Sequence, residues 1–136
     1  MSEQAYPYKA TDGNCKYSSA EALQDITVTG FTTVASNSVA ALQSAIALNP
    51  VAVSIDATCL AMRFYSSGVF DDVDCGTDLD HAVLATGYGV EGGQKYYNVK
   101  NSWNTGWGEE GYIKIAAVIG KGIVGIQMAS TYPNLE

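Results

Sequence analysis

The sequence predicts a fold of the α+β class that is mainly β, with one main helix near residues 38–48. Nine tyrosines against three phenylalanines, together with fourteen glycines, favour turns and strands with one solvent-exposed face over a helical bundle. The strand-like segments that follow the helix are separated by connections too short for crossover helices. A length of 136 residues with 47% hydrophobic and 15% charged residues is typical of one folded domain.

The expected elements can be placed in chain order. Residues 1–35 read as an irregular, extended lead-in with a β-prone piece at 26–31. Ser36-Asn37-Ser38 offers a helix N-cap, apolar residues recur at helical spacing after it, and Pro50 forbids continuation. Strands are predicted at 51–55, 81–88, 95–101, 111–115 and 123–128, with a hairpin connection at 91–94 that makes its two strands antiparallel.

Charge and composition exclude several kinds of partner. The net charge is −7 and the sequence has no basic run, which argues against nucleic acid because phosphate binding needs clustered cations. No apolar stretch reaches the roughly 18 residues of a membrane span, and the polar start Met1-Ser2-Glu3-Gln4 predicts no targeting signal. One histidine and three cysteines without CxxC spacing predict no metal site, and no cofactor is expected.

Two motifs could carry chemistry, although neither is decisive alone. His81 follows Asp80 at the head of an apolar strand, and Asn101-Ser102-Trp103 closes a later strand. A histidine satisfied by a neighbour and polar residues that end a strand would explain each motif separately.

Together the motifs are far more specific. Two segments resemble the histidine and asparagine segments of papain, actinidin and cathepsin L. They are Asp80-His81-Ala82-Val83-Leu84-Ala85-Thr86-Gly87-Tyr88-Gly89 and Tyr97-Asn98-Val99-Lys100-Asn101-Ser102-Trp103-Asn104-Thr105-Gly106-Trp107-Gly108-Glu109-Glu110-Gly111-Tyr112-Ile113-Lys114-Ile115. The chain thus resembles the papain family of cysteine peptidases, and residues 1–136 resemble its C-terminal, antiparallel barrel-like domain.

This resemblance implies roles for four residues. His81 matches the catalytic histidine, which holds the nucleophilic cysteine as a thiolate and protonates the leaving amine. Asn101 matches the residue whose amide oxygen orients that imidazole. Trp103 matches the tryptophan that covers this hydrogen bond from water, and Trp107 the one that lines the leaving-group side.

The resemblance also implies a polypeptide substrate and a specificity pocket. The positions that match the second subsite are mostly small or apolar, which predicts a hydrophobic residue two positions before the scissile bond, although ordinary wall packing would explain them as well. They are Ser54, Leu79, Asp80, Ala82 and Ala129.

The nucleophile itself is missing from the sequence. The family places it in a Cys-Gly-Ser/Ala-Cys-Trp/Tyr segment about 130 to 150 residues before the histidine and asparagine, and no such segment is present. We therefore expect the helical N-terminal domain to be absent and the isolated chain to be inactive. A second chain could supply that domain, the sequence could be a fragment, or catalysis could be lost, leaving a peptide- or protein-binding remnant.

The resemblance also bears on the cysteines and on location. Cys15 matches a cysteine that bridges to the missing domain, and the usual partner position of Cys75 is occupied by Val124. We expect Cys59 to pair with Cys75 in an oxidising compartment, and three free thiols in a reducing one. The parent family is lysosomal or extracellular.

Overall fold

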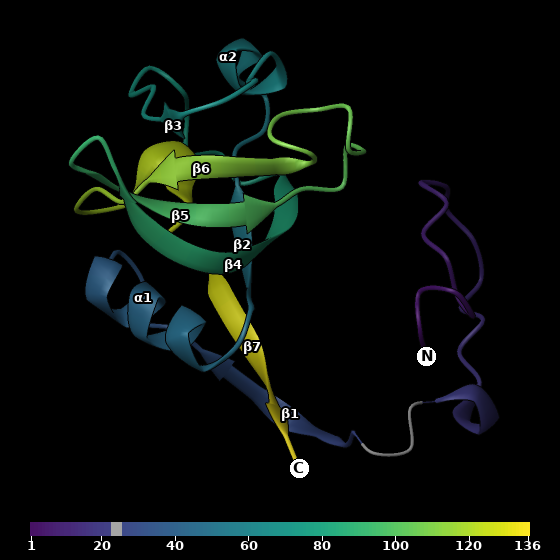
Figure 1. The fold of residues 1–136 in the computed structure, drawn as a ribbon. Helices are drawn as coiled ribbons and strands as arrows, with labels where there is room; N and C mark the ends of the chain where they lie inside the picture. The colour runs from purple at the N-terminus through teal and green to yellow at the C-terminus, as the bar shows by residue number, and fades with distance from the viewer. Residues whose placement is uncertain (23–25) are drawn as a thin grey trace. The chain divides into compact units, whose positions relative to one another are not determined.

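A computed structural model describes residues 1–22 and 26–136, which form two units. One unit comprises Met1–Gly30 with Pro133–Glu136, and the other comprises Phe31–Tyr132. The elements are η1 (Ser19–Glu21), β1 (Val28–Thr33), α1 (Val39–Leu48), β2 (Val51–Ile55), α2 (Leu60–Arg63), β3 (Val69–Phe70), β4 (His81–Glu91), β5 (Gln94–Lys100), β6 (Tyr112–Ala116), η2 (Ile123–Gly125) and β7 (Ser130–Leu135) (Figure 1).

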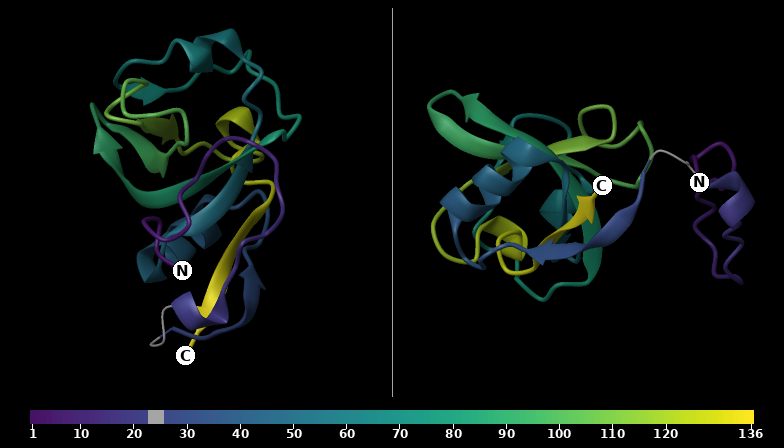
Figure 2. Two further views of the ribbon diagram at one scale, coloured as in Figure 1. Left: turned by 90° about the vertical axis from the view of Figure 1, so that its right-hand side faces the viewer. Right: turned by 90° about the horizontal axis from the view of Figure 1, so that it is seen from below.

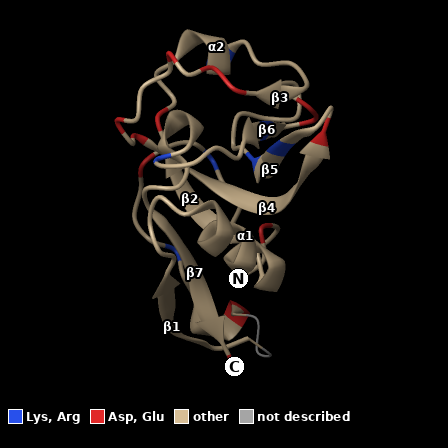
Figure 3. Cartoon of the chain, turned by 90° about the vertical axis from the view of Figure 1, so that its left-hand side faces the viewer, with Lys and Arg blue, Asp and Glu red and all other residues tan. Residues whose placement is uncertain are grey.

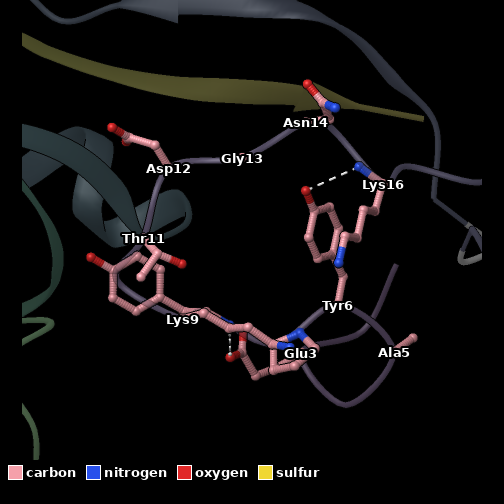
Figure 4. A pocket seen from close by; sticks show the side chains of 11 residues that line it. Glu3, Ala5, Tyr6, Lys9, Thr11, Asp12, Gly13, Asn14 and Lys16 are labelled. Atoms are coloured by element: carbon pink, nitrogen blue, oxygen red, sulfur yellow. Dashed lines mark hydrogen bonds between the residues drawn. The ribbon is translucent and has the colours of Figure 1, made fainter.

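The first unit is mostly irregular, as expected for the lead-in, of which residues 23–25 lie outside the described part of the chain. Residues 3–16 curl around a shallow depression, in which the Tyr6 hydroxyl accepts a hydrogen bond from the Lys16 amide at 3.1 Å (Figure 4). The Tyr8 amide donates to a Glu3 carboxylate oxygen at 2.8 Å. No residue predicted to belong to the catalytic site lines this depression.

The predicted helix is confirmed as α1. Its N-cap is Ser38, whose hydroxyl accepts from the Ala41 amide at 3.2 Å and so satisfies one of the free amides of the first turn. Leu42, Ala45 and Ile46 are buried, and Pro50 follows the C-cap. Figures 1 and 2 show α1 lying against the curved sheet, where it packs on β4.

Seven strands form one sheet in the order β1-β7-β2-β4-β5-β6-β3. The inner strands β2, β4, β5 and β6 pair antiparallel, whereas the two-residue β3 pairs parallel to β6. The mainly β prediction is confirmed, with one difference from a barrel. The sheet does not close, because β1 and β3 remain as its two edges.

The predicted hairpin at 91–94 is also confirmed. Glu91 pairs with Gln94 across the turn, and Gly92 and Gly93 between them have φ values of 57° and 86°. Two consecutive positive φ angles are what a two-residue hairpin turn requires, and glycine adopts them without steric cost.

The predicted strand at 123–128 is wrong. Ile123–Gly125 form the 3-10 helix η2, and the last strand begins later, at Ser130. Gly122, Val124 and Gly125 have φ values of 77°, 51° and 74°, which no β-strand accommodates. The segment is apolar because residues 123–126 are all buried, so its hydrophobicity reflects burial and gives no information on strand geometry.

One continuous core lies inside the second unit. Alternate residues of the inner strands point into it, as period-two patterning requires. The largest fully buried side chains are Tyr97, Leu42, Ile55, Met62, Ile113, Ile115, Ile126, Val51, Val53, Val99 and Val124. The Tyr97 hydroxyl donates to the buried Gln127 at 2.8 Å, and burial raises the pKa of this tyrosine.

Basic residues are few among the described residues. Figure 3 draws them in blue, on the neighbouring strands β5 and β6, in α2 and in loops. None of the described helices is long and apolar enough to cross a membrane.

Candidate active site

The sheet brings His81 and Asn101 together. His81 is the first residue of β4, and Asn101 directly follows β5. Because β4 and β5 are antiparallel, the start of one strand and the end of the other lie at the same end of the sheet. The His81 Nε2 and Asn101 Oδ1 atoms are 2.8 Å apart, and the ring's Nδ1 makes no hydrogen bond to any described residue.

Local hydrogen bonds fix the Asn101 side chain. Its Oδ1 also accepts from the Ser102 backbone amide at 2.7 Å, and the backbone amide of Asn101 donates to the Gly111 carbonyl at 3.0 Å. A flipped side chain would turn its NH₂ group against the Ser102 donor, so the oxygen faces the imidazole. Nδ2 is buried without a partner among the described residues.

Two tryptophans lie beside this pair, Trp103 in direct contact with the imidazole and Trp107 in contact with Trp103. The Trp103 ring stacks on the His81 imidazole, with centroids 5.3 Å apart and an interplanar angle of 21°. Trp107 meets Trp103 edge to face at 5.1 Å, and its Nε1 donates to the Arg63 carbonyl at 3.1 Å. An imidazole beneath an aromatic face is shielded from water, which strengthens its remaining hydrogen bond.

The segment that leads into His81 is held by two carboxylates. Asp56 is 2% exposed and accepts from the Thr58 hydroxyl at 2.7 Å, the Thr58 amide at 3.0 Å and the Asp78 amide at 3.0 Å. Asp80 accepts from the Ala57 amide at 2.8 Å. These bonds connect residues 56–58 to residues 78–80, directly before the histidine.

We predict that Asp56→Ala lowers the free energy of unfolding by about 3 kcal/mol, because three donors lose a charged acceptor. Hydrogen bonds from the Thr58 hydroxyl and then the Thr58 amide lower the pKa of Asp56, although burial opposes them. Its stabilisation is therefore complete above the unfolded pKa of about 3.9 and lost as pH falls through the lower folded pKa. Urea unfolding between pH 3 and pH 7 measures the free energy of unfolding of each variant, with Asp74→Asn, a change at an exposed carboxylate, as the control. An equal loss of unfolding free energy in Asp56→Ala and Asp74→Asn would contradict the prediction.

The residues expected at the second subsite lie in three places. Ser54 on β2 lies opposite Ala82 on β4, and the Ser54 amide donates to the Ala129 carbonyl at 3.0 Å, so these three small residues are neighbours. Leu79 lies near Gly125, where an added Cβ would come within 2.8 Å of its Cδ2 atom. The Asp80 carboxylate accepts a hydrogen bond from the Ala57 amide at 2.8 Å.

The cysteines take distinct positions. Cys59 and Cys75 form a disulfide with Cα atoms 5.3 Å apart, while Cys15 is free and exposed. Val124 is 1% exposed in η2. Asp72 lies beside the disulfide, but the sulfurs of Cys59 and Cys75 are bonded to each other and offer no thiolate to a metal.

Several residues near the site were not anticipated from sequence. Tyr65 packs on Trp107 with centroids 5.8 Å apart, and its hydroxyl donates to the Gly68 carbonyl at 2.6 Å. Glu109 accepts from the Gly68 amide at 2.9 Å. The Gly106-Trp107-Gly108-Glu109 run signals a tightly turned loop, yet no sequence signal links it to Gly68.

Comparison with known proteins agrees with this geometry. The model of the papain family cysteine proteases matches residues 1–134. The chain is 47% identical to a probable cysteine protease, RD21B, of Arabidopsis thaliana over 96% of its own length and 28% of the relative's. It is 46% identical to digestive cysteine proteinase 2 of Homarus americanus, over 96% of this chain and 40% of that protein.

Solved structures show the same relationship. Bromelain protease from Ananas comosus, in complex with the E64 inhibitor, matches with a TM-score of 0.87 and 42% identity over 99% of this chain and 62% of that chain. Procathepsin L 3 from Tenebrio molitor larval midgut matches with a TM-score of 0.88 and 42% identity, over 98% of this chain and 43% of that chain. This chain belongs to the papain family of cysteine proteases, which confirms the resemblance. It spans less than half the length of the curated relatives described above.

Proposed function

We propose that this chain supplies the histidine and asparagine of a papain-type catalytic site for peptide-bond hydrolysis, and that the cysteine nucleophile comes from polypeptide outside these 136 residues. The observation that carries the proposal is the 2.8 Å contact between His81 Nε2 and Asn101 Oδ1 beneath Trp103. An amide oxygen orients the ring without competing for its proton, and the contact leaves Nδ1 available to a thiol.

The chain's own cysteines do not fit the role of nucleophile. Cys59 and Cys75 are joined to each other, and a disulfide sulfur cannot act as a thiolate. Cys15 stands between Asn14 and Lys16, without the flanking residues of the family's nucleophile segment. The isolated chain is therefore expected to be inactive.

The proposed mechanism assigns every proton transfer to His81. Nδ1 takes the thiol proton, the thiolate adds to the scissile carbonyl carbon, and the imidazolium then protonates the leaving nitrogen as the C–N bond breaks. A thioester remains. His81 next takes a proton from water, the oxygen adds to the thioester carbon, and the thiolate leaves, which releases a carboxylic acid product.

The substrate contribution of this chain is a wall of mostly small or apolar residues. Ser54, Ala82 and Ala129 present little bulk, Leu79 adds apolar surface, and one Asp80 carboxylate oxygen accepts from the Ala57 amide. A side chain that leaves water for such a wall gains most if it is apolar. We propose a preference for hydrophobic residues two positions before the cleaved bond.

The test is to join the chain to a papain-type N-terminal domain that carries the cysteine, in one polypeptide, and to assay peptidyl fluorogenic substrates under reducing conditions. The proposal expects turnover in the joined protein that requires both the added cysteine and His81. A folded joined protein that binds peptides without cleaving them would instead indicate a binding module.

A further prediction concerns the disulfide. We expect oxidised protein to contain one free thiol, Cys15, and a bridge between Cys59 and Cys75 that closes a loop of 16 residues and adds roughly 3 kcal/mol to stability. Formation of the bridge would place maturation in an oxidising compartment. Thiol counting on denatured protein, with Cys15→Ser as control, measures this; three free thiols, or a bridge that contains Cys15, would contradict it.

A further inference from the structure

The strongest unassigned feature is the carboxylate of Glu109, which follows Trp107 and Gly108 in the loop after β5. One oxygen accepts from the Gly68 amide at 2.9 Å, and Lys114 Nζ lies 3.0 Å from the other. The hydrogen bond from Gly68 is the main cause of a lowered Glu109 pKa, with Lys114 acting in the same direction. A backbone amide with a charged acceptor is a stronger and more directional contact than a surface ion pair.

The segment that Glu109 contacts is the one that holds Trp107. The Arg63 carbonyl accepts from the indole Nε1 at 3.1 Å, and the Tyr65 ring packs on the indole. Tyr65 is itself fixed by its hydrogen bond to the Gly68 carbonyl. Glu109 therefore binds the backbone amide of Gly68, and Tyr65 binds its carbonyl. Gly68 thus connects the loop that carries Trp107 to the segment that packs against the indole.

From Trp107 the contacts continue to the imidazole. Trp107 packs on the edge of Trp103, and Trp103 stacks on His81. A shift of the Trp107 loop away from residues 63–69 would loosen the cover over the pair of His81 and Asn101. Packed side chains transmit such displacements because protein interiors have few voids.

We propose that Glu109 is a positioning residue for the catalytic pair, acting through its hydrogen bond to the Gly68 amide to hold Trp107, and with it Trp103, over His81. This inference rests on the proposed function only for the role of the pair; the positioning itself is a property of this chain. The neighbouring Glu91, which also pairs with Lys114, at 2.7 Å, is a matched carboxylate without the backbone contact.

Nuclear magnetic resonance of the chain tests this without an activity assay. The sequence has one histidine and two tryptophans, so the His81 ring proton and the two indole N–H signals are separately visible, and Trp103→Phe assigns the Trp107 signal. We expect Glu109→Ala to speed solvent exchange of the Trp107 indole proton about tenfold and to reduce the ring-current shift of the His81 proton. Glu109→Gln retains an acceptor for Gly68 and should remain near the parent values, as should Glu91→Ala.

Two results would overturn the inference. One is a folded Glu109→Ala variant with parent-like indole exchange and His81 shift, and the other is an equal effect from Glu91→Ala. If Glu109→Ala does not fold, Glu109→Asp replaces it, because a side chain one methylene shorter retains the charge but not the reach to Gly68. Fast exchange of the Trp107 indole proton in Glu109→Asp, with slow exchange in Glu109→Gln, supports the role of the hydrogen bond between Gly68 and Glu109. The reverse pattern refutes it.

Discussion

Replacing His81 with alanine should reduce kcat of the joined two-domain protein by at least about 10³-fold, because every proton transfer of the proposed mechanism loses its carrier. The fold should change little, since His81 is only partly buried and its side chain contacts Asn101 and Trp103 at the start of strand β4. Fluorogenic peptidase assays measure the change in kcat, and thermal unfolding of the same preparations measures the change in stability.

The control for this variant is Lys95→Ala, an exposed position on the same hairpin. It should retain parent activity and stability. A His81→Ala protein that is folded and turns substrate over at a parent-like rate would show that another group moves the protons, and the assigned role of the histidine would be wrong.

The second large effect is expected at Gly108. Its φ is +59°, and an added Cβ would lie 2.5 Å from the Tyr112 carbonyl oxygen and 3.1 Å from Cδ1 of Tyr65. Gly108→Ala therefore combines left-handed strain with a collision against backbone, and should cost roughly 3 kcal/mol of stability or displace the loop that carries Trp107. Urea unfolding with Trp fluorescence reports both outcomes.

Two other glycines separate the causes. Gly92 has a φ of +57° with open space around it, so Gly92→Ala should cost about 1 kcal/mol from strain alone. Gly106 has open space and no positive φ, so Gly106→Ala should fall within about 0.5 kcal/mol of the parent. Equal effects at all three positions would show that contact with Tyr112 and Tyr65 is unimportant.

The parts of the fold that the sequence predicted well are those set by local signals. The helix has a capping serine before it and Pro50 after it, and the hairpin has Gly92-Gly93, so nearby residues specify each element. The 3-10 helix at Ile123–Gly125 was missed because a fully buried run has no periodicity to distinguish strand from helix. The barrel expectation came from family resemblance, whereas the observed sheet stays open at β1 and β3.

The site shows the same division. His81 and Asn101 were singled out by motif resemblance, and the pairing of β4 with β5 then places them within 2.8 Å. Glu109 could not be connected to Gly68, because 41 residues separate them and nothing local in either segment encodes the contact. The hydrogen bond from the Ala57 amide to the Asp80 carboxylate is likewise revealed only by the three-dimensional structure.

The central claim is that this chain contributes the imidazole but not the thiolate. The most direct measurement compares the purified chain with the joined two-domain protein, using a thiol-alkylating peptidyl probe and a fluorogenic substrate at pH 5 to 7 under reducing conditions. We expect neither turnover nor His81-dependent labelling from the chain alone, and both from the joined protein. Turnover by the chain alone that disappears with His81→Ala would contradict it.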